Sequence, residues 1–283
     1  MAHLFIIGLG YSAQAIRAAA RRRGWRVTAT GRAGDLAFDN EVAVRAAMAA
    51  ASHVLSSVPP ADGADPVLER YGDALGQHWL GYLSSTGIYG DAGGAWVDES
   101  APTLVQRPGA GRRIARAQAD AAWLGRGARV FRLPGIYGPG RSALDRVRAG
   151  RAHRVDAPGQ VFSRIHVEDL AAGVAAAWDS AAPAGAYNLA DDLPASQNAV
   201  IEEACRLLGR EPPPLVPLED AGLSPTARDF YAENRRVASG KARRVLGWTL
   251  RHRDYRAGLA ACLAAEPATA GPAASAPRAR AGQ

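Results

Sequence analysis

The chain has 283 residues, of which 48% are hydrophobic and 22% are charged, and its formal net charge is +7. This length is sufficient for one or two domains with a substantial core, and the composition is that of an ordinary globular protein. No apolar segment is long enough to span a bilayer, and the N-terminal apolar run has no basic region or cleavage site of a signal peptide. We therefore expect a cytoplasmic protein that binds no membrane.

The positive charge by itself is a weak indication of a nucleic-acid partner. The arginines are scattered without a long basic block, and Lys241 is the only lysine. We therefore predict no nucleic-acid binding. The only cysteines, Cys205 and Cys262, exclude a disulfide scaffold and a cysteine-based zinc site, and no metal site is predicted.

The first thirty residues have the pattern strand, glycine-rich turn, helix and strand. A short apolar run at 4–7 predicts the first strand, 15–23 has helical composition, and 26–30 is a second strand. Between the first strand and the helix lies a G-x-G-x-x-A sequence, formed by Gly8, Leu9, Gly10, Tyr11, Ser12 and Ala13. In that context the glycines allow a backbone to approach a pyrophosphate, to which the helix N-terminus offers free N–H groups. We predict that these residues bind a dinucleotide.

The residues after the second strand indicate which dinucleotide is bound. NAD sites usually place an acidic residue there for the ribose 2′-hydroxyl, whereas NADP sites place an arginine near the 2′-phosphate. The second strand is followed directly by Gly31 and Arg32, and neither position holds an acidic residue. A guanidinium can bind a phosphate with two hydrogen bonds, so NADP is favoured. NAD stays an alternative because Asp35 is near.

Strand and helix patterns continue to alternate up to about residue 137. The predicted strands are at 36–38 (a weak one), 53–58, 79–85 and 128–133, and the predicted helices are at 41–51, 66–75 and 114–124. Such alternation predicts an α/β Rossmann-type fold with a doubly wound parallel sheet. Ligands of these folds bind beyond the carboxyl ends of the strands. The turns after Ile7, Thr30, Val58, Ser85 and Leu133 should therefore converge on one crevice.

From residue 138 the pattern changes to loops and helices. Helices are predicted at 167–178, 199–208, 237–246 and 255–264, with a strand at 186–189. We predict a Rossmann domain over 1–137, to which 160–190 returns. A smaller, mostly helical substrate lobe is predicted over 138–159 and 191–264. Residues 265–283 have no periodicity and are predicted to be a disordered tail.

Four segments together resemble the extended short-chain dehydrogenase/reductase superfamily, of the NAD-dependent epimerase/dehydratase type. They are 8–13, 83–90, 132–140 and 164–170. The resemblance covers nearly the whole chain except the tail. The G-x-G-x-x-A motif is shorter than the family's commoner G-x-x-G-x-x-G and is more similar to the motif of the atypical subgroups. It implies an NAD(P)-dependent oxidoreductase, a small-molecule substrate and a homodimer.

The resemblance also implies a catalytic Ser and a Tyr-x-x-x-Lys pair. Ser85 matches the position of the serine, which polarises a carbonyl; alternatively it only caps a turn. The best alignment of the pair places Arg112 at the tyrosine and Arg116 at the lysine. A guanidinium stays protonated and cannot replace tyrosine in proton transfer, although it can stabilise an oxyanion or a substrate phosphate. The chain therefore lacks the standard pair, and its proton donor is unconventional.

Further residues are expected around the cofactor and the substrate. Four residues match cofactor-contacting positions, two at the end of the strand predicted at 53–58 and two after the strand at 128–133; they are Ser57, Val58, Pro134 and Ile136. Tyr89 and Tyr137 are interpreted as packed aromatic residues, and His166 as part of an architectural block. Arginines flanking the crevice suit an anionic substrate that resembles a sugar nucleotide. The alternative function is a non-catalytic NAD(P)-binding sensor or partner-binding protein.

Overall fold

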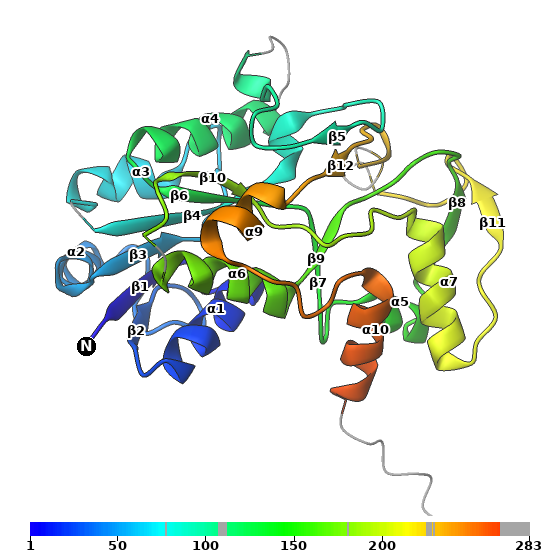
Figure 1. Cartoon of the computed structure of the whole chain (residues 1–283), viewed down its shortest axis with the longest axis horizontal. Coiled ribbons are helices and arrows are strands. Elements are labelled where there is room, and N and C mark those ends of the chain that lie inside the picture. Colours follow the sequence, from blue (N-terminus) through cyan, green and yellow to red (C-terminus); the bar gives the residue numbers. More distant parts are fainter. Residues whose placement is uncertain (77, 107–111, 180, 225–227, 229, 267–283) are drawn as a thin grey trace, which may run out of the picture.

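The structure is a computed structural model that describes residues 1–76, 78–106, 112–179, 181–224, 228 and 230–266, without the side chains at 106, 112 and 113. Its centre is a sheet of six parallel strands in the order β10-β6-β4-β3-β1-β2. The strands are β1 (His3–Ile7), β2 (Arg26–Ala29), β3 (His53–Ser56), β4 (Trp79–Ser85), β6 (Arg129–Leu133) and β10 (Gly185–Asn188). Because all six are parallel, their carboxyl ends lie along one edge, as the sequence predicted (Figure 1).

Helices cover both faces of this sheet, which makes it a doubly wound Rossmann-type fold. On one face lie α1 (Tyr11–Arg22), α6 (Val167–Asp179) and α9 (Gly240–Leu246), and on the other α2 (Glu41–Ala50), α3 (Pro66–Tyr71) and α4 (Arg112–Gly125). Alternate residues of β1 enter two separate cores: Leu4 and Ile6 pack with α1 and α6, whereas Phe5 and Ile7 pack with α2 and α3. This alternation explains why β1 is a continuous apolar run.

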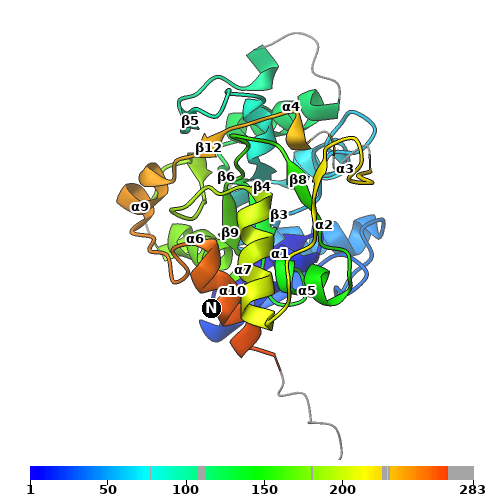
Figure 2. The same ribbon diagram turned by 90° about the vertical axis from the view of Figure 1, so that its right-hand side faces the viewer.

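The rest of the chain forms short strand pairs and a second group of helices. The pairs are β5 (Trp96–Val97) with β12 (Arg236–Val237), β7 (Gly135–Tyr137) with β9 (Arg164–His166), and β8 (Arg154–Asp156) with β11 (Leu215–Pro217). A third core joins α5 (Ala143–Arg148), α7 (Gln197–Leu208) and α10 (Tyr255–Ala264). Figure 2 shows these three helices in front of the sheet. Single 3-10 turns, η1 (Gly72–Ala74), η2 (Thr86–Tyr89) and η3 (Leu104–Gln106), complete the described elements.

The chain after residue 160 contributes to the central sheet. Helix α6 packs along α1, and β10 pairs with β6 at the sheet edge, with Gly185 opposite Arg129. The division into domains at residues 137 and 191 stays a prediction. Most of the predicted tail, from residue 267, lies outside the described residues. Among the described helices, none combines the length and the apolar content that crossing a bilayer requires.

One predicted element is wrong, and one helix begins later than predicted. Residues 36–38 form no strand, because Asp35 and Leu36 both donate their N–H groups to the carbonyl of Ala29, which turns the segment back onto the end of β2. Leu36 makes only an isolated bridge with Thr30. The helix predicted from Val237 begins only at Gly240, because Val237 pairs with Val97.

Candidate functional site

The glycine-rich turn joins β1 directly to α1. Gly8 has a φ of +89°, and a side chain there would come within 2.8 Å of Val58, so this position requires glycine. Gly10 is the N-cap of α1, no side chain caps the helix, and its first turn contains no acidic residue. A Cβ at Gly10 would meet no atom within 4 Å, so the space in front of the helix is open. The turn thus presents an uncapped helix N-terminus to this space.

Segments that follow β2 and β3 hold this turn in place. The backbone N–H of Leu9 donates to the carbonyl of Thr30 at 2.8 Å, and that of Gly8 donates to the Thr30 hydroxyl at 3.0 Å. The Ser57 hydroxyl donates to the carbonyl of Gly8. Gly31, with a φ of +119°, lies against Leu9. Three of the predicted turns therefore converge, with Ser57 and Val58 supporting the glycines from the side.

Arg32 and Asp35 differ in their surroundings. The Arg32 side chain is exposed, and no hydrogen bond or ion pair is found for it among the described residues. The Asp35 carboxylate instead accepts a hydrogen bond of 2.9 Å from the backbone N–H of Ala29. Asp35 therefore binds the end of β2, while Arg32 is free to bind an anion that reaches this edge.

Ser85 ends β4 and begins the 3-10 turn η2. Its hydroxyl oxygen accepts from the backbone N–H of Gly87 at 3.1 Å, so it caps the turn, as one of the two predicted roles requires. The side chain is only half-buried, and its proton has no acceptor among the described residues. The adjacent strand places Leu133 opposite Ser85, so Pro134, which is half-buried, follows at the same edge. Ile136, also half-buried, lies in β7, the next strand along the chain, and pairs with Ile165 of β9.

The two arginines at the predicted Tyr and Lys positions lie on α4. Arg116 is exposed, and the side chain of Arg112 lies outside the described part of the structure. Sequence reasoning missed a third arginine near Ser85. A methyl group at Gly87 would lie 3.9 Å from the guanidinium of Arg235, which donates to the Gly90 carbonyl at 2.7 Å. Arg235 is 145 residues from Gly90, so no local pattern indicates this proximity.

The two tyrosines interpreted as packed residues have bound hydroxyls. The hydroxyl of Tyr89 donates to Asn188 at 2.8 Å and accepts from Arg132 at 3.0 Å. Burial raises the pKa of Tyr89 to about 12, against the opposing effect of Arg132. The hydroxyl of Tyr137 donates to the carbonyl of Asp254 at 3.3 Å, and burial raises its pKa well above the usual value. Neither hydroxyl is poised to exchange a proton near pH 7.

Arg132 binds Tyr89 and also forms a buried ion pair. Its guanidinium binds the carboxylate of Asp120 at 2.8 Å, and the Ser84 hydroxyl donates to the same carboxylate at 2.7 Å. Asp120 belongs to the segment of α4 that also carries Arg116. The network fixes α4 against β4 and β6, which sets where residues 112 and 116 lie relative to Ser85.

Tyr11 closes the other side of the site. Its hydroxyl donates to the carbonyl of Pro139 at 3.1 Å, and the guanidinium of Arg141 lies 5.5 Å from its ring centre. Gly138 allows this approach, since a Cβ there would lie 2.6 Å from the Tyr11 oxygen. Burial raises the pKa of Tyr11 to about 12. The first residue of α1 thus fastens the loop that follows β7.

Asp191, which follows β10, is a buried carboxyl with an unusual environment. It is 2% exposed, and neither carboxylate oxygen has a hydrogen-bond partner among the described residues. Burial raises its pKa to about 8, although Arg164 partly opposes the shift. An unfolded chain ionises this group near pH 4, so between about pH 4 and pH 8 the folded protein binds the extra proton. The stability due to Asp191 is therefore present below that window and is lost as the pH rises through it.

We expect the free energy of unfolding of the wild type to fall between pH 5 and pH 8 relative to Asp191→Asn. The difference should change by up to about 1.4 kcal/mol per pH unit, as for one bound proton. Urea unfolding at a series of pH values measures it. Asp192→Asn is the matched control: the pKa of Asp192 is lowered, with Arg243 and Arg253 as its partners, so its loss should cost stability at neutral pH but not in acid. Parallel curves for Asp191→Asn and the wild type would exclude the buried protonated carboxyl.

Comparison with known proteins shows similarity over most of the chain. No protein-family model matches the sequence. A curated reductase from Streptomyces sp., named 3-diazoavenalumate denitrifying reductase, is 31% identical over 179 residues; the match spans 58% of this chain and 58% of that protein. A conserved protein of unknown function from Silicibacter pomeroyi is 38% identical in its solved structure, with a TM-score of 0.82 over 93% of this chain and 99% of that one.

More distant solved structures share the fold. A putative NAD-dependent epimerase/dehydratase from Methylobacillus flagellatus is 20% identical, with a TM-score of 0.72 over 93% of this chain and 98% of that one. The human epimerase family protein SDR39U1, solved with NADPH, is 16% identical, with a TM-score of 0.70 over 90% of this chain and 97% of that one. At these identities the likeness concerns the fold alone.

Proposed function

Because the chain belongs to one family with the Silicibacter pomeroyi protein and has the fold of epimerase/dehydratase-type short-chain dehydrogenases and reductases, we propose that it is an NAD(P)-dependent oxidoreductase that favours NADP. The observation that carries the proposal is the uncapped N-terminus of α1, which has open space in front of Gly10, together with Arg32, which follows β2 and has no partner among the described residues. Together they offer backbone N–H groups and one guanidinium to a phosphorylated dinucleotide.

The residues present fit this cofactor. The N–H groups of Tyr11, Ser12 and Ala13 begin α1 and would bind the pyrophosphate, for which no side chain competes in the described structure. Arg32 would bind the 2′-phosphate, since its guanidinium is exposed and has no partner among the described residues, whereas one oxygen of the Asp35 carboxylate accepts from Ala29. By the resemblance, the backbone around Pro134 and Ile136 would contact the nicotinamide. When bound, NADPH supplies a hydride.

The substrate end of the site is proposed to lie around Ser85. The Ser85 oxygen accepts from Gly87, which leaves its proton to be donated to a substrate oxygen. Arg235, whose charge is paired with Glu233 at 2.7 Å, lies beside Gly87, and Arg116 is exposed on α4, so we propose that Arg116 supplies the free positive charge on this side of the site. With Arg112, they suit an anionic substrate such as a sugar nucleotide. The name of the Streptomyces relative, a reductase, supports a reduction.

The test is NADPH oxidation measured with panels of carbonyl compounds and sugar nucleotides. We expect turnover with at least one anionic substrate, and Ser85→Ala should lower kcat about 100-fold, as the loss of one donor to a developing oxyanion does. Ser85→Thr keeps the hydroxyl and is the matched variant that should retain most of the activity. Tight NADPH binding without turnover of any compound would contradict the enzyme proposal.

A second candidate is a non-catalytic NAD(P)-binding sensor or partner-binding protein. It is favoured by the arginines at positions 112 and 116, where the resemblance expects Tyr and Lys, and by the bound hydroxyls of Tyr89 and Tyr137. If Arg112→Tyr combined with Arg116→Lys creates turnover in a protein that has none, the sensor is supported. Loss of an existing activity in Ser85→Ala supports the enzyme.

Two further parts of the proposal concern the compartment and the assembly. Cys205 and Cys262 are both free and buried, which is consistent with a reducing cytoplasm. The resemblance suggests a homodimer, which sedimentation of the purified protein would detect.

A further inference from the structure

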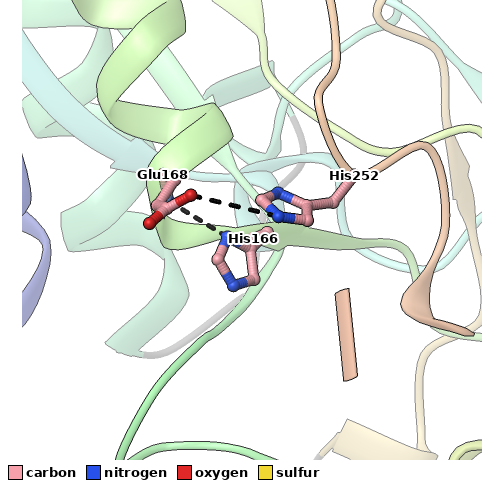
Figure 3. Close-up of side chains that lie close together, drawn as sticks. All are labelled: His166, Glu168 and His252. Carbon is pink, nitrogen blue, oxygen red and sulfur yellow. Dashed lines mark hydrogen bonds and ion pairs between the residues drawn. The ribbon is translucent and has the colours of Figure 1, made fainter. Parts of the chain in front are cut away.

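Three side chains capable of binding a metal converge on the side of the molecule where α6 begins. His166 ends β9, Glu168 lies in the first turn of α6, and His252 comes from the segment that leads to α10. One ligand atom of each lies within 4.8 Å of the others, and Figure 3 shows the three side chains facing one another. None of them is part of the proposed nucleotide site.

The ring of His252 is oriented by Asp169. The Nδ1 atom of His252 lies 2.8 Å from the Asp169 carboxylate, which also accepts from the backbone N–H groups of His252 and Arg251. In the tautomer that donates from Nδ1 to this carboxylate, the lone pair of the ring lies on Nε2. That atom lies 3.9 Å from the Glu168 carboxylate. A carboxylate behind a histidine in this manner is the usual outer partner of a metal-binding histidine.

The ring of His166 is held in the complementary way. Its Nδ1 accepts from the backbone N–H of Glu168 at 3.3 Å, so the lone pair lies on Nδ1. Its Nε2 lies 3.6 Å from the sulfur of Cys262, which orients the far side of the ring. The centres of the two imidazole rings are 4.0 Å apart. The ring of His166 thus has a partner at both nitrogens, whereas Nε2 of His252 lies on the side of the Glu168 carboxylate, 3.9 Å away.

The cluster has more acceptors than donors. The lone pair on His166 Nδ1 receives only the long bond from the backbone N–H of Glu168, and the Glu168 carboxylate has Arg251 at 3.4 Å, on a side chain that is 79% exposed. Nε2 of His252 has no hydrogen bond among the described residues. The histidines are 2% and 5% exposed, so water compensates little for this excess of acceptors on their side. A cation between the three groups would satisfy all of them.

We propose that His166, Glu168 and His252 bind one divalent transition-metal ion of the zinc type, separate from any nucleotide site. Two imidazoles and one carboxylate are ligands that Zn²⁺ accepts in proteins, at about 2.0–2.2 Å. Binding requires the half-exposed Glu168 side chain to move inward by roughly 1 Å and the long hydrogen bond at His166 to yield. The ion joins the start of α6 to the segment before α10 and so stabilises the fold.

The test is a titration of the full-length chain, without an affinity tag and after treatment with a chelator, with Co²⁺ as a spectroscopic probe and Zn²⁺ as competitor. We expect one equivalent of Co²⁺ to give visible d–d absorption, Zn²⁺ to displace it, and Zn²⁺ to raise the melting temperature. Glu168→Gln, at a half-exposed site, should fold normally and bind at least tenfold more weakly, and His252→Ala should not bind.

Asp179→Asn, an exposed carboxylate at the other end of α6, is the matched control and should bind as the wild type does. If His252→Ala does not fold, metal binding by Glu168→Gln alone tests the proposal. Absence of stoichiometric binding in the wild type, or equal binding by Glu168→Gln, would show that the cluster only anchors the chain and would overturn the proposal.

Discussion

Gly10→Asp is expected to leave the protein folded and to abolish its binding of NADPH. Gly10 has extended backbone angles, φ −84° and ψ −171°, and a side chain there meets no atom, so the substitution introduces no strain. Aspartate is a favourable N-cap, which accepts from the first N–H groups of a helix. It therefore occupies the groups offered to the pyrophosphate and places a negative charge beside it.

The measurement combines thermal unfolding with an NADPH titration by fluorescence. We expect a melting temperature that is unchanged or raised by up to about 4 °C, and an affinity reduced at least a hundredfold. Ala18→Asp adds the same charge to an exposed position further along α1; it should leave the affinity for NADPH unchanged and lower the melting temperature by up to about 3 °C, since aspartate is a weaker helix former than alanine. Equal NADPH binding by Gly10→Asp and the wild type would place the nucleotide elsewhere or exclude it.

Arg32→Glu is expected to reverse the preference between the two cofactors. The guanidinium has no partner among the described residues, so its replacement disturbs no contact of the fold. Its interaction with a 2′-phosphate is of the charge-assisted kind, worth about 1.5–3 kcal/mol, or ten- to a hundredfold in affinity. Glutamate would repel the phosphate and accept a hydrogen bond from the free 2′-hydroxyl of NADH.

The ratio of the dissociation constants for NADH and NADPH in wild type and mutant gives the result. Asp35→Asn serves as the control, since that carboxylate binds the N–H of Ala29 and should contribute little to the preference. If Arg32→Glu leaves the ratio unchanged while Asp35→Asn alters it, the Asp35 carboxylate binds the ribose 2′-hydroxyl and the protein favours NAD.

The central sheet was predictable because its signals are local. Strand β1 is a short apolar run, the other strands are short segments with apolar residues among polar ones, and the glycines, Arg32 and Ser85 lie at or just after the carboxyl ends of strands, so the parallel order brings them to one edge. The apolar residue Phe38 suggested a strand at 36–38. In the structure its ring instead makes an edge-on contact with the ring of Tyr71. Val237 was misread because a two-residue strand has too little pattern to compete with the adjacent helix.

The parts of the site that depend on distant segments were not predictable. Arg235 lies beside Gly87 only because β12 pairs with β5, a contact without a sequence signal in either strand. His252 approaches Glu168 because Asp169 anchors the backbone at Arg251 and His252. Asp191 has an ordinary sequence context, and its raised pKa is a consequence of burial that only the packed structure shows.

Direct titration of the wild-type protein with NADPH and NADH tests the central claim, that the turn at Gly8–Gly10 and Arg32 form a site for a phosphorylated nicotinamide dinucleotide. We expect saturable binding of one equivalent of NADPH per chain, tighter than that of NADH by at least tenfold. Binding of neither nucleotide would contradict it, because the uncapped helix and the glycines would then serve only the fold.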